Sequence, residues 1–142
     1  ETDAMDARWW PVEALGLDEQ ARAWRDRTPY GGPAAPLAFD HAPIASDAVE
    51  RVRAKLEYST LATGFVREPF SLADLRLVYA AVWGFEPDPA NFRRKVLSIP
   101  GFVEPLRAPL RSPGPAGGRP AALYRAGRAV TISPPFLRER AG

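Results

Sequence analysis

A pattern of apolar and polar residues with helical spacing begins at about residue 43. Apolar side chains recur there at three- and four-residue steps, which favours a helix over about residues 43–62. The apolar stripe consists of Ile44, Ala48, Val49, Val52 and Leu56. Asp47, Arg51 and Lys55 occupy another face at four-residue steps, where an acid preceding a base adds slight support. Gly64 closes the segment.

The next helix has clear boundaries in the sequence. Ser71 can cap its N-terminus, and Asp74 stands three residues later, as in a capping box. Phe70 and Leu75 have the spacing of a hydrophobic staple across this cap. Gly84 is predicted to end the helix. The buried stripe is predicted to comprise Leu72, Leu75, Val78, Tyr79 and Val82.

A third helix follows after a four-residue connection, residues 85–88. Asp88 is a good N-cap and Pro89 suits the first helical position, so the helix should run from about 89 to 98, before Pro100 and Gly101. Two helices joined by a short turn, after another helix, form the helix-turn-helix plan. The spacing of Phe92, Val96 and Ile99 turns these three toward the core. It turns Asn91, Arg94, Lys95 and Ser98 outward, with Arg93 on the flank.

Two short strands are predicted after the third helix. Residues 102–104 and 123–125 can pair, and the four prolines and three glycines of residues 105–118 predict a loop between them. A two-stranded ribbon after three helices makes a winged helix-turn-helix, a mainly α fold with a small β wing (α+β). A further strand-like run at 129–132 has no assigned role, nor do Pro134 and Pro135.

The N-terminal part is less regular. Residues 7–12 are typical of a short strand ended by proline, 18–27 of a short helix, and 28–36 of a loop. Asp40 and His41 could act as a general acid/base pair or as metal ligands, but a role in capping the following helix is favoured. Trp9 and Trp10 are more typical of a core or an interface than of stacking on a base.

Composition excludes several classes of site and partner. The chain of 142 residues has no cysteine and one histidine, which excludes disulfides, thiolate metal sites and multi-histidine metal sites. No apolar run approaches the roughly 18 residues of a membrane helix, and the acidic N-terminus does not suit a signal peptide. We therefore expect a cytoplasmic, nucleoid-associated protein. The 17 arginines, 2 lysines and 24 alanines suggest a GC-rich bacterial genome.

Charge is distributed unevenly along the chain. Residues 1–64 contain 7 basic and 11 acidic side chains, whereas residues 65–142 contain 12 and 6. Within the basic part, Asn91 can pair with adenine and arginine with guanine at the major-groove edge, while Lys95 and further arginines suit phosphates. Arg119 would lie at the wing tip and Arg125 on the second wing strand, both within reach of DNA. The alternative for the third helix is a surface helix with solubilising arginines.

These residues in this order resemble the Nudix-related transcriptional regulators, the NrtR family. The motifs that carry the resemblance extend over about residues 5–126. They are ARWWPV at 7–12, LAFDH at 37–41, FSL at 70–72 with Leu75 and Tyr79, NFRRK at 91–95, and GRP at 118–120 with LYR at 123–125. The resemblance implies a repressor that often controls NAD metabolism. Its Nudix-like sensor domain would bind a nucleotide such as ADP-ribose, and its winged helix would bind a palindromic DNA operator as a dimer.

The chain departs from the family in one respect: the glutamate-rich Nudix box is nowhere in it. We therefore expect the C-terminal part of a longer protein, without hydrolase activity or a cofactor of its own. Residues 1–42 would be the end of a Nudix-like domain, 43–64 a connecting first helix and 65–142 the winged helix. The alternative is that these residues form a dimerisation or interaction region of an active Nudix pyrophosphohydrolase.

Overall fold

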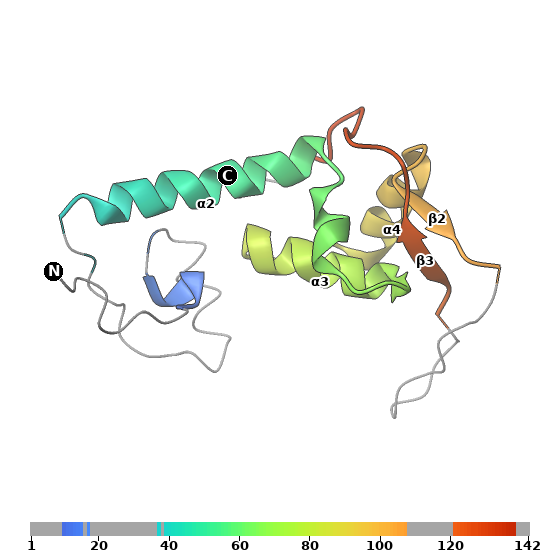
Figure 1. Cartoon of the computed structure of the whole chain (residues 1–142), viewed down its shortest axis with the longest axis horizontal. Coiled ribbons are helices and arrows are strands. Elements are labelled where there is room, and N and C mark those ends of the chain that lie inside the picture. Colours follow the sequence, from blue (N-terminus) through green and yellow to red (C-terminus); the bar gives the residue numbers. More distant parts are fainter. Residues whose placement is uncertain (1–9, 16, 18–36, 38, 108–120, 139–142) are drawn as a thin grey trace, which may run out of the picture. The chain divides into compact units, whose positions relative to one another are not determined.

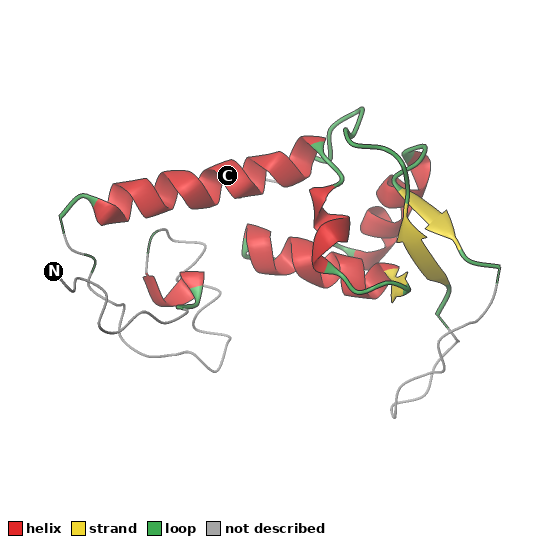
Figure 2. Ribbon diagram, viewed as in Figure 1, coloured by secondary structure: helices red, strands yellow, loops and turns green. Residues whose placement is uncertain are grey.

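The computed structural model describes residues 10–15, 17, 37, 39–107 and 121–138. The helix and loop predicted within 18–36 and most of the loop predicted at 105–118 therefore lie outside the described residues. The chain divides into two compact units, residues 1–50 and 51–142. Figures 1 and 2 show the course of the chain and its elements.

The described part of the first unit begins with a short 3₁₀ helix, η1 (Val12–Leu15). The strand predicted at 7–12 is wrong for its described residues, because Trp10 and Pro11 have no regular structure and Val12 begins the helical turn. The Ala14 N–H donates to the Pro11 carbonyl at 3.0 Å. Proline, with its fixed φ, is well suited to start such a turn and cannot donate to a strand ladder.

The long helix α2 (His41–Tyr58) starts two residues earlier and ends four residues earlier than its pattern predicts. Its end coincides with a tertiary contact: the Thr60 N–H donates to the Val130 carbonyl at 3.2 Å. The chain then turns into a second 3₁₀ helix, η2 (Leu61–Phe65), which contains Gly64. Backbone pairing with a segment 70 residues away thus determines where α2 stops.

The apolar stripe of α2 is mostly exposed. Ile44 and Val52 are 59% and 49% exposed, and of the stripe residues Leu56 is the buried one. Two charged residues, Arg53 and Glu57, are buried beside it. Periodicity identified the helix correctly, but the packing partners at its C-terminal turns decide which face is covered.

The helix α3 (Leu72–Trp83) has the predicted caps. The Ser71 N–H donates to Asp74 Oδ2 at 2.9 Å, and the Asp74 N–H donates to Ser71 Oγ at 3.2 Å, which is the reciprocal capping box. Gly84 ends the helix in the left-handed conformation at φ 77°, where its missing Cβ avoids strain. The predicted stripe is buried or half-buried, and Trp83 at 1% exposure joins it.

The helix α4 (Pro89–Ser98) has the predicted bounds. Asp88 Oδ1 accepts a hydrogen bond from the Asn91 N–H at 2.8 Å, so the N-cap is confirmed. Phe92, Val96 and Ile99 are 1%, 0% and 5% exposed, which confirms their orientation toward the core.

A three-stranded antiparallel sheet with the order β1-β3-β2 completes the unit. Strand β2 (Val103–Pro105) and strand β3 (Leu123–Ala126) pair as predicted, with Glu104 opposite Arg125. The short strand β1 (Phe70–Ser71) pairs with the other edge of β3 and was not predicted. The winged helix-turn-helix prediction is confirmed: the C-terminal turns of α2, helices α3 and α4 and a small sheet contribute side chains to one core. Figure 2 shows these helices and strands.

Residues 129–132 form no strand but a single bridge with Ser59, the residue that follows α2. Thr131 pairs with Ser59, and the Ile132 N–H donates to the Tyr58 carbonyl at 2.7 Å. We call residues 129–138 the C-terminal segment. It continues along the end of α2, where the Phe136 N–H donates to the Glu57 carbonyl at 2.8 Å. No helix among the described residues is long and apolar enough to cross a membrane.

Candidate nucleic-acid interface

The outward face of α4 carries most of the predicted DNA-binding residues. Asn91, Arg93 and Arg94 are exposed, and Lys95 is half-buried. Arg94 Nη2 donates to Asn91 Oδ1 at 2.8 Å, so the two side chains lie together one turn apart. This pair presents an amide and a guanidinium side by side, the two groups that read adenine and guanine edges in the major groove.

Aromatic packing anchors the opposite face of α4. The ring of Phe92 lies edge-on to Tyr79 of α3, with centroids 5.2 Å apart, and 5.4 Å from Phe136 of the C-terminal segment. Both Tyr79 and Phe92 are fully buried. A helix held in this way presents its outward side chains from a rigid base, which a reading helix requires.

An ion pair braces the turn between α3 and α4. Arg76 Nη1 lies 3.1 Å from Glu86 Oε2 and donates to the Pro87 carbonyl at 3.3 Å. This pair was not predicted from the sequence, because its residues are ten positions apart across a turn. It fixes the connection whose geometry sets the angle between the two helices.

Of the two wing cations predicted to reach DNA, Arg125 lies in the described part of the wing. Arg125 is exposed, but its Nε and Nη2 donate to Glu104 Oε2 at 2.9 and 2.7 Å, across the β2–β3 pair. A phosphate would therefore compete with Glu104 for this guanidinium. Arg107, exposed just beyond β2 on the side of the wing loop, carries a further positive charge. Arg119 and the GRP motif at 118–120 lie outside the described residues.

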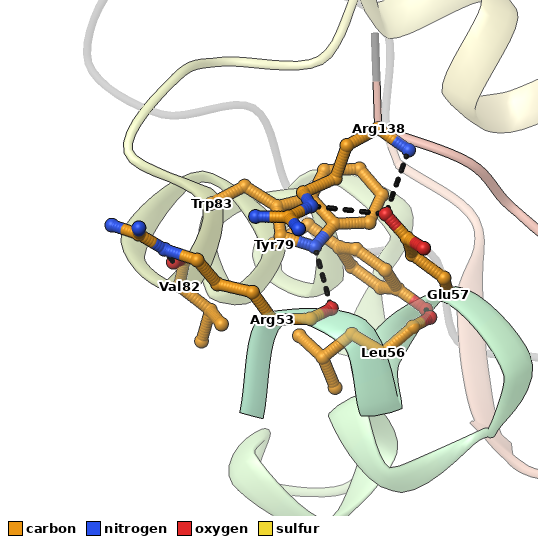
Figure 3. A network of polar contacts seen from close by, with 7 residues as sticks. All are labelled: Arg53, Leu56, Glu57, Tyr79, Val82, Trp83 and Arg138. Atoms are coloured by element: carbon orange, nitrogen blue, oxygen red, sulfur yellow. Dashed lines mark hydrogen bonds and ion pairs between the residues drawn. The ribbon is translucent and has the colours of Figure 1, made fainter. Parts of the chain in front are cut away.

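A buried polar network joins the C-terminal half of α2 to α3 and to the C-terminal segment (Figure 3). Arg53 Nε donates to the Val82 carbonyl at 2.9 Å, and Trp83 Nε1 donates back to the Arg53 carbonyl at 3.3 Å. Arg138 Nε pairs with Glu57 Oε1 at 2.9 Å, and both side chains are almost fully buried. Burial also raises the pKa of the Tyr79 hydroxyl, which faces the Leu56 carbonyl.

Sequence reasoning missed this network because charged residues on a helix are ordinarily solvent-exposed. Arg53 and Glu57 stand four residues apart on α2, and that shared face was the available signal. Their partners come from residues 82 and 138, which periodicity cannot connect to α2.

Asp40 and His41 lie at the start of α2, and both are exposed. The Asp40 carbonyl accepts a bond from the Ile44 N–H at 3.4 Å, so the backbone of Asp40 joins the first turn of α2. Phe39 is 96% exposed and Trp10 46%, so neither side chain fills a core. Among the described residues, no three His, Cys, Asp or Glu side chains gather where they could hold a metal ion.

Comparison with known proteins agrees with this geometry. Residues 64–126 match the family model of the NrtR DNA-binding winged helix domain. The chain is 30% identical over 89 residues to the "ADPR responsive transcriptional repressor NtrR" of Acinetobacter baylyi, covering 63% of this chain and 34% of that protein. The chain thus spans about a third of the length of this curated relative.

Solved structures of NrtR from Shewanella oneidensis are also similar. One, in complex with a 27mer DNA, matches with a TM-score of 0.53 at 27% identity, over 88% of this chain and 47% of that one. Another matches with a TM-score of 0.54 at 24% identity, over 95% and 52% of the two chains, and supports the fold alone. With the capped α3–α4 pair and the β2–β3 wing, these matches show that residues 64–126 form a winged helix similar to the DNA-binding domain of the NrtR family.

Proposed function

We propose that the protein is a transcriptional repressor that binds a palindromic DNA operator as a homodimer. The observation that carries the proposal is the basic outward face of α4, held by a buried aromatic base in a domain of the NrtR type. The relative from Acinetobacter baylyi is a repressor by its name, and a Shewanella oneidensis NrtR has been solved with DNA. Both support this assignment.

Within the domain, α4 enters the major groove, where some of its side chains contact bases and others contact phosphates. The Asn91–Arg94 pair faces the base edges, while Arg93 and Lys95, on the two flanks, contact phosphates. Arg119 and Arg125 serve the wing, where Arg125 exchanges Glu104 for a phosphate oxygen. Such an exchange replaces one charge-assisted pair with another, so its net gain in affinity is small.

The proposal extends to a longer protein with a sensor. Residues 1–42 are the end of a Nudix-like domain, 43–64 connect it, and 65–142 form the DNA-binding domain. A nucleotide such as ADP-ribose, bound to the Nudix-like domain, releases the operator and so regulates genes of NAD metabolism. The relative's name describes it as ADPR-responsive, which supports this effector class. The chain itself acts without catalysis or a cofactor.

DNA binding is tested by a double substitution on α4. Arg94→Ala with Lys95→Ala should weaken binding to DNA from upstream of the protein's own gene. The loss of the base contact costs about 1–3 kcal/mol, and the loss of one phosphate contact lowers the salt slope by about 1. Arg51→Ala with Lys55→Ala removes the same charge from the exposed surface of α2 and is the matched control. Equal affinity and salt slope in both variants would refute the assignment of α4.

The alternative, an interaction region of an active Nudix pyrophosphohydrolase, is favoured by one observation. The exposed apolar side chains of α2, Ile44 and Val52, suit contact with another protein surface. Hydrolysis of ADP-ribose by the full-length protein, with no retardation of upstream DNA, would establish this alternative. Retardation that ADP-ribose abolishes would establish the repressor.

A further inference from the structure

The outward face of α4 has an apolar side as well as a polar one. Successive side chains of an α-helix project about 100° apart, so the buried Phe92, Val96 and Ile99 define a direction opposite to Arg94. Asn91 and Ser98 lie on one side of Arg94, within about 60° of it, and Ala90 and Leu97 lie at similar angles on the other side. All of these side chains except the three core residues are exposed.

Leu97 lies outside the hydrophobic core of the domain. Its side chain is 46% exposed, while the core face of α4 is already filled by Phe92 and Val96 at 1% and 0% exposure. The other exposed residues of the helix are polar except for Pro89, at its first position, and Ala90, which is seven residues before Leu97 and projects in nearly the same direction. Leu97 and Ala90 therefore form an apolar edge beside the guanidinium of Arg94.

We propose that this edge reads thymine, with Leu97 contacting the C5-methyl group of a thymine next to the base pair that Arg94 contacts. The inference rests on the proposed function, in which α4 enters the major groove. The thymine methyl is the apolar group that the major groove presents, and an aliphatic side chain recognises it by burial. Helix α4 is about 15 Å long, so its whole outward face spans about four or five base pairs.

The test removes the methyl group alone. Duplexes bound by the 142-residue chain are first selected from a random-sequence pool, and each thymine of the consensus is then replaced by uracil. At one thymine per half-site, uracil should weaken binding by about fourfold, the effect of one buried methylene-sized group. Leu97→Ala should bind the thymine and uracil duplexes equally. Leu77→Ala removes a 56% exposed leucine from α3 and should keep the wild-type preference.

Two results would overturn the inference. The first is a wild-type affinity that no uracil replacement lowers. The second is a Leu97→Ala variant that keeps the full preference for thymine; if that variant also lost affinity by the same factor on both duplexes, Leu97 would be assigned to a protein contact. Selection that enriches no sequence at all would instead contradict the proposed function, since the chain would then not read DNA.

Discussion

Replacing Phe136 with alanine should destabilise the winged helix domain, although this residue lies beyond the segment that matches the family model. Its ring centroid is 5.4 Å from each of the rings of Tyr79, Trp83 and Phe92. Those three residues come from α3 and α4, so Phe136 joins the C-terminal segment to both helices of the helix-turn-helix. The family model ends at residue 126.

The expected loss follows from the burial of the ring. Truncating a fully buried phenylalanine to alanine costs about 3–5 kcal/mol, and Phe136 is partly buried, so we expect about 2–3 kcal/mol. A domain of this size is stable by about 5–15 kcal/mol, so the variant should still fold. With a urea m-value of about 1.5 kcal/mol/M, the midpoint should fall by roughly 1.3–2 M.

Urea unfolding followed by circular dichroism at the helix band measures this shift. Phe65→Ala is the matched control, because it removes the same ring from a side chain that is 72% exposed. Its midpoint should move by less than about 0.3 M, since exposed substitutions change stability by about 0.5 kcal/mol at most. If Phe136→Ala moved the midpoint no further than Phe65→Ala, the C-terminal segment would not belong to the folded core.

Three further predictions concern single side chains. Burial raises the pKa of Tyr79, so the folded protein retains the tyrosine proton at a pH where the unfolded chain loses it. The free energy of unfolding should therefore keep its full value below about pH 10, the ordinary pKa of tyrosine, and fall above it. Tyr79→Phe should flatten the fall measured between pH 9 and 11. Gly127→Ala should unfold the wing pairing, because a Cβ there would collide with the Gly101 carbonyl; a thermal midpoint equal to the wild type would contradict this. Glu57→Gln should cost about 3 kcal/mol by leaving the buried Arg138 guanidinium without its anion, and unchanged urea unfolding would refute that reasoning.

Much of the winged helix could be predicted from local signals. The capping box at Ser71, the left-handed Gly84 and the Asp88–Pro89 start of α4 each depend on residues within one helical turn of each other. The outward face of α4 followed from the same periodicity, since it lies opposite Phe92 and Val96. The part of the candidate site that lies on the single helix α4 could therefore be predicted from the sequence.

The predictions failed where contacts are distant in the sequence. Residues 129–132 have a strand-like sequence, but they pair with the end of α2 only through the single bridge between Thr131 and Ser59. The stripe on α2 identified a helix without showing that Ile44 and Val52 stay exposed. The pairing of Arg125 with Glu104 was also not predicted, because strand register depends on where the chain folds back.

The sequence by itself determined the boundaries of α3 and α4, the turn between them, and the basic surface of the reading helix. These features depend on short-range geometry, in which caps, glycine and helical periodicity act over a few residues. Only the tertiary structure decided that Arg53 and Glu57 are buried, that the C-terminal segment completes the aromatic core, and that Arg125 already has an anionic partner. Those outcomes depend on desolvation and packing between segments far apart in the chain, and a local sequence pattern does not identify partners at that distance.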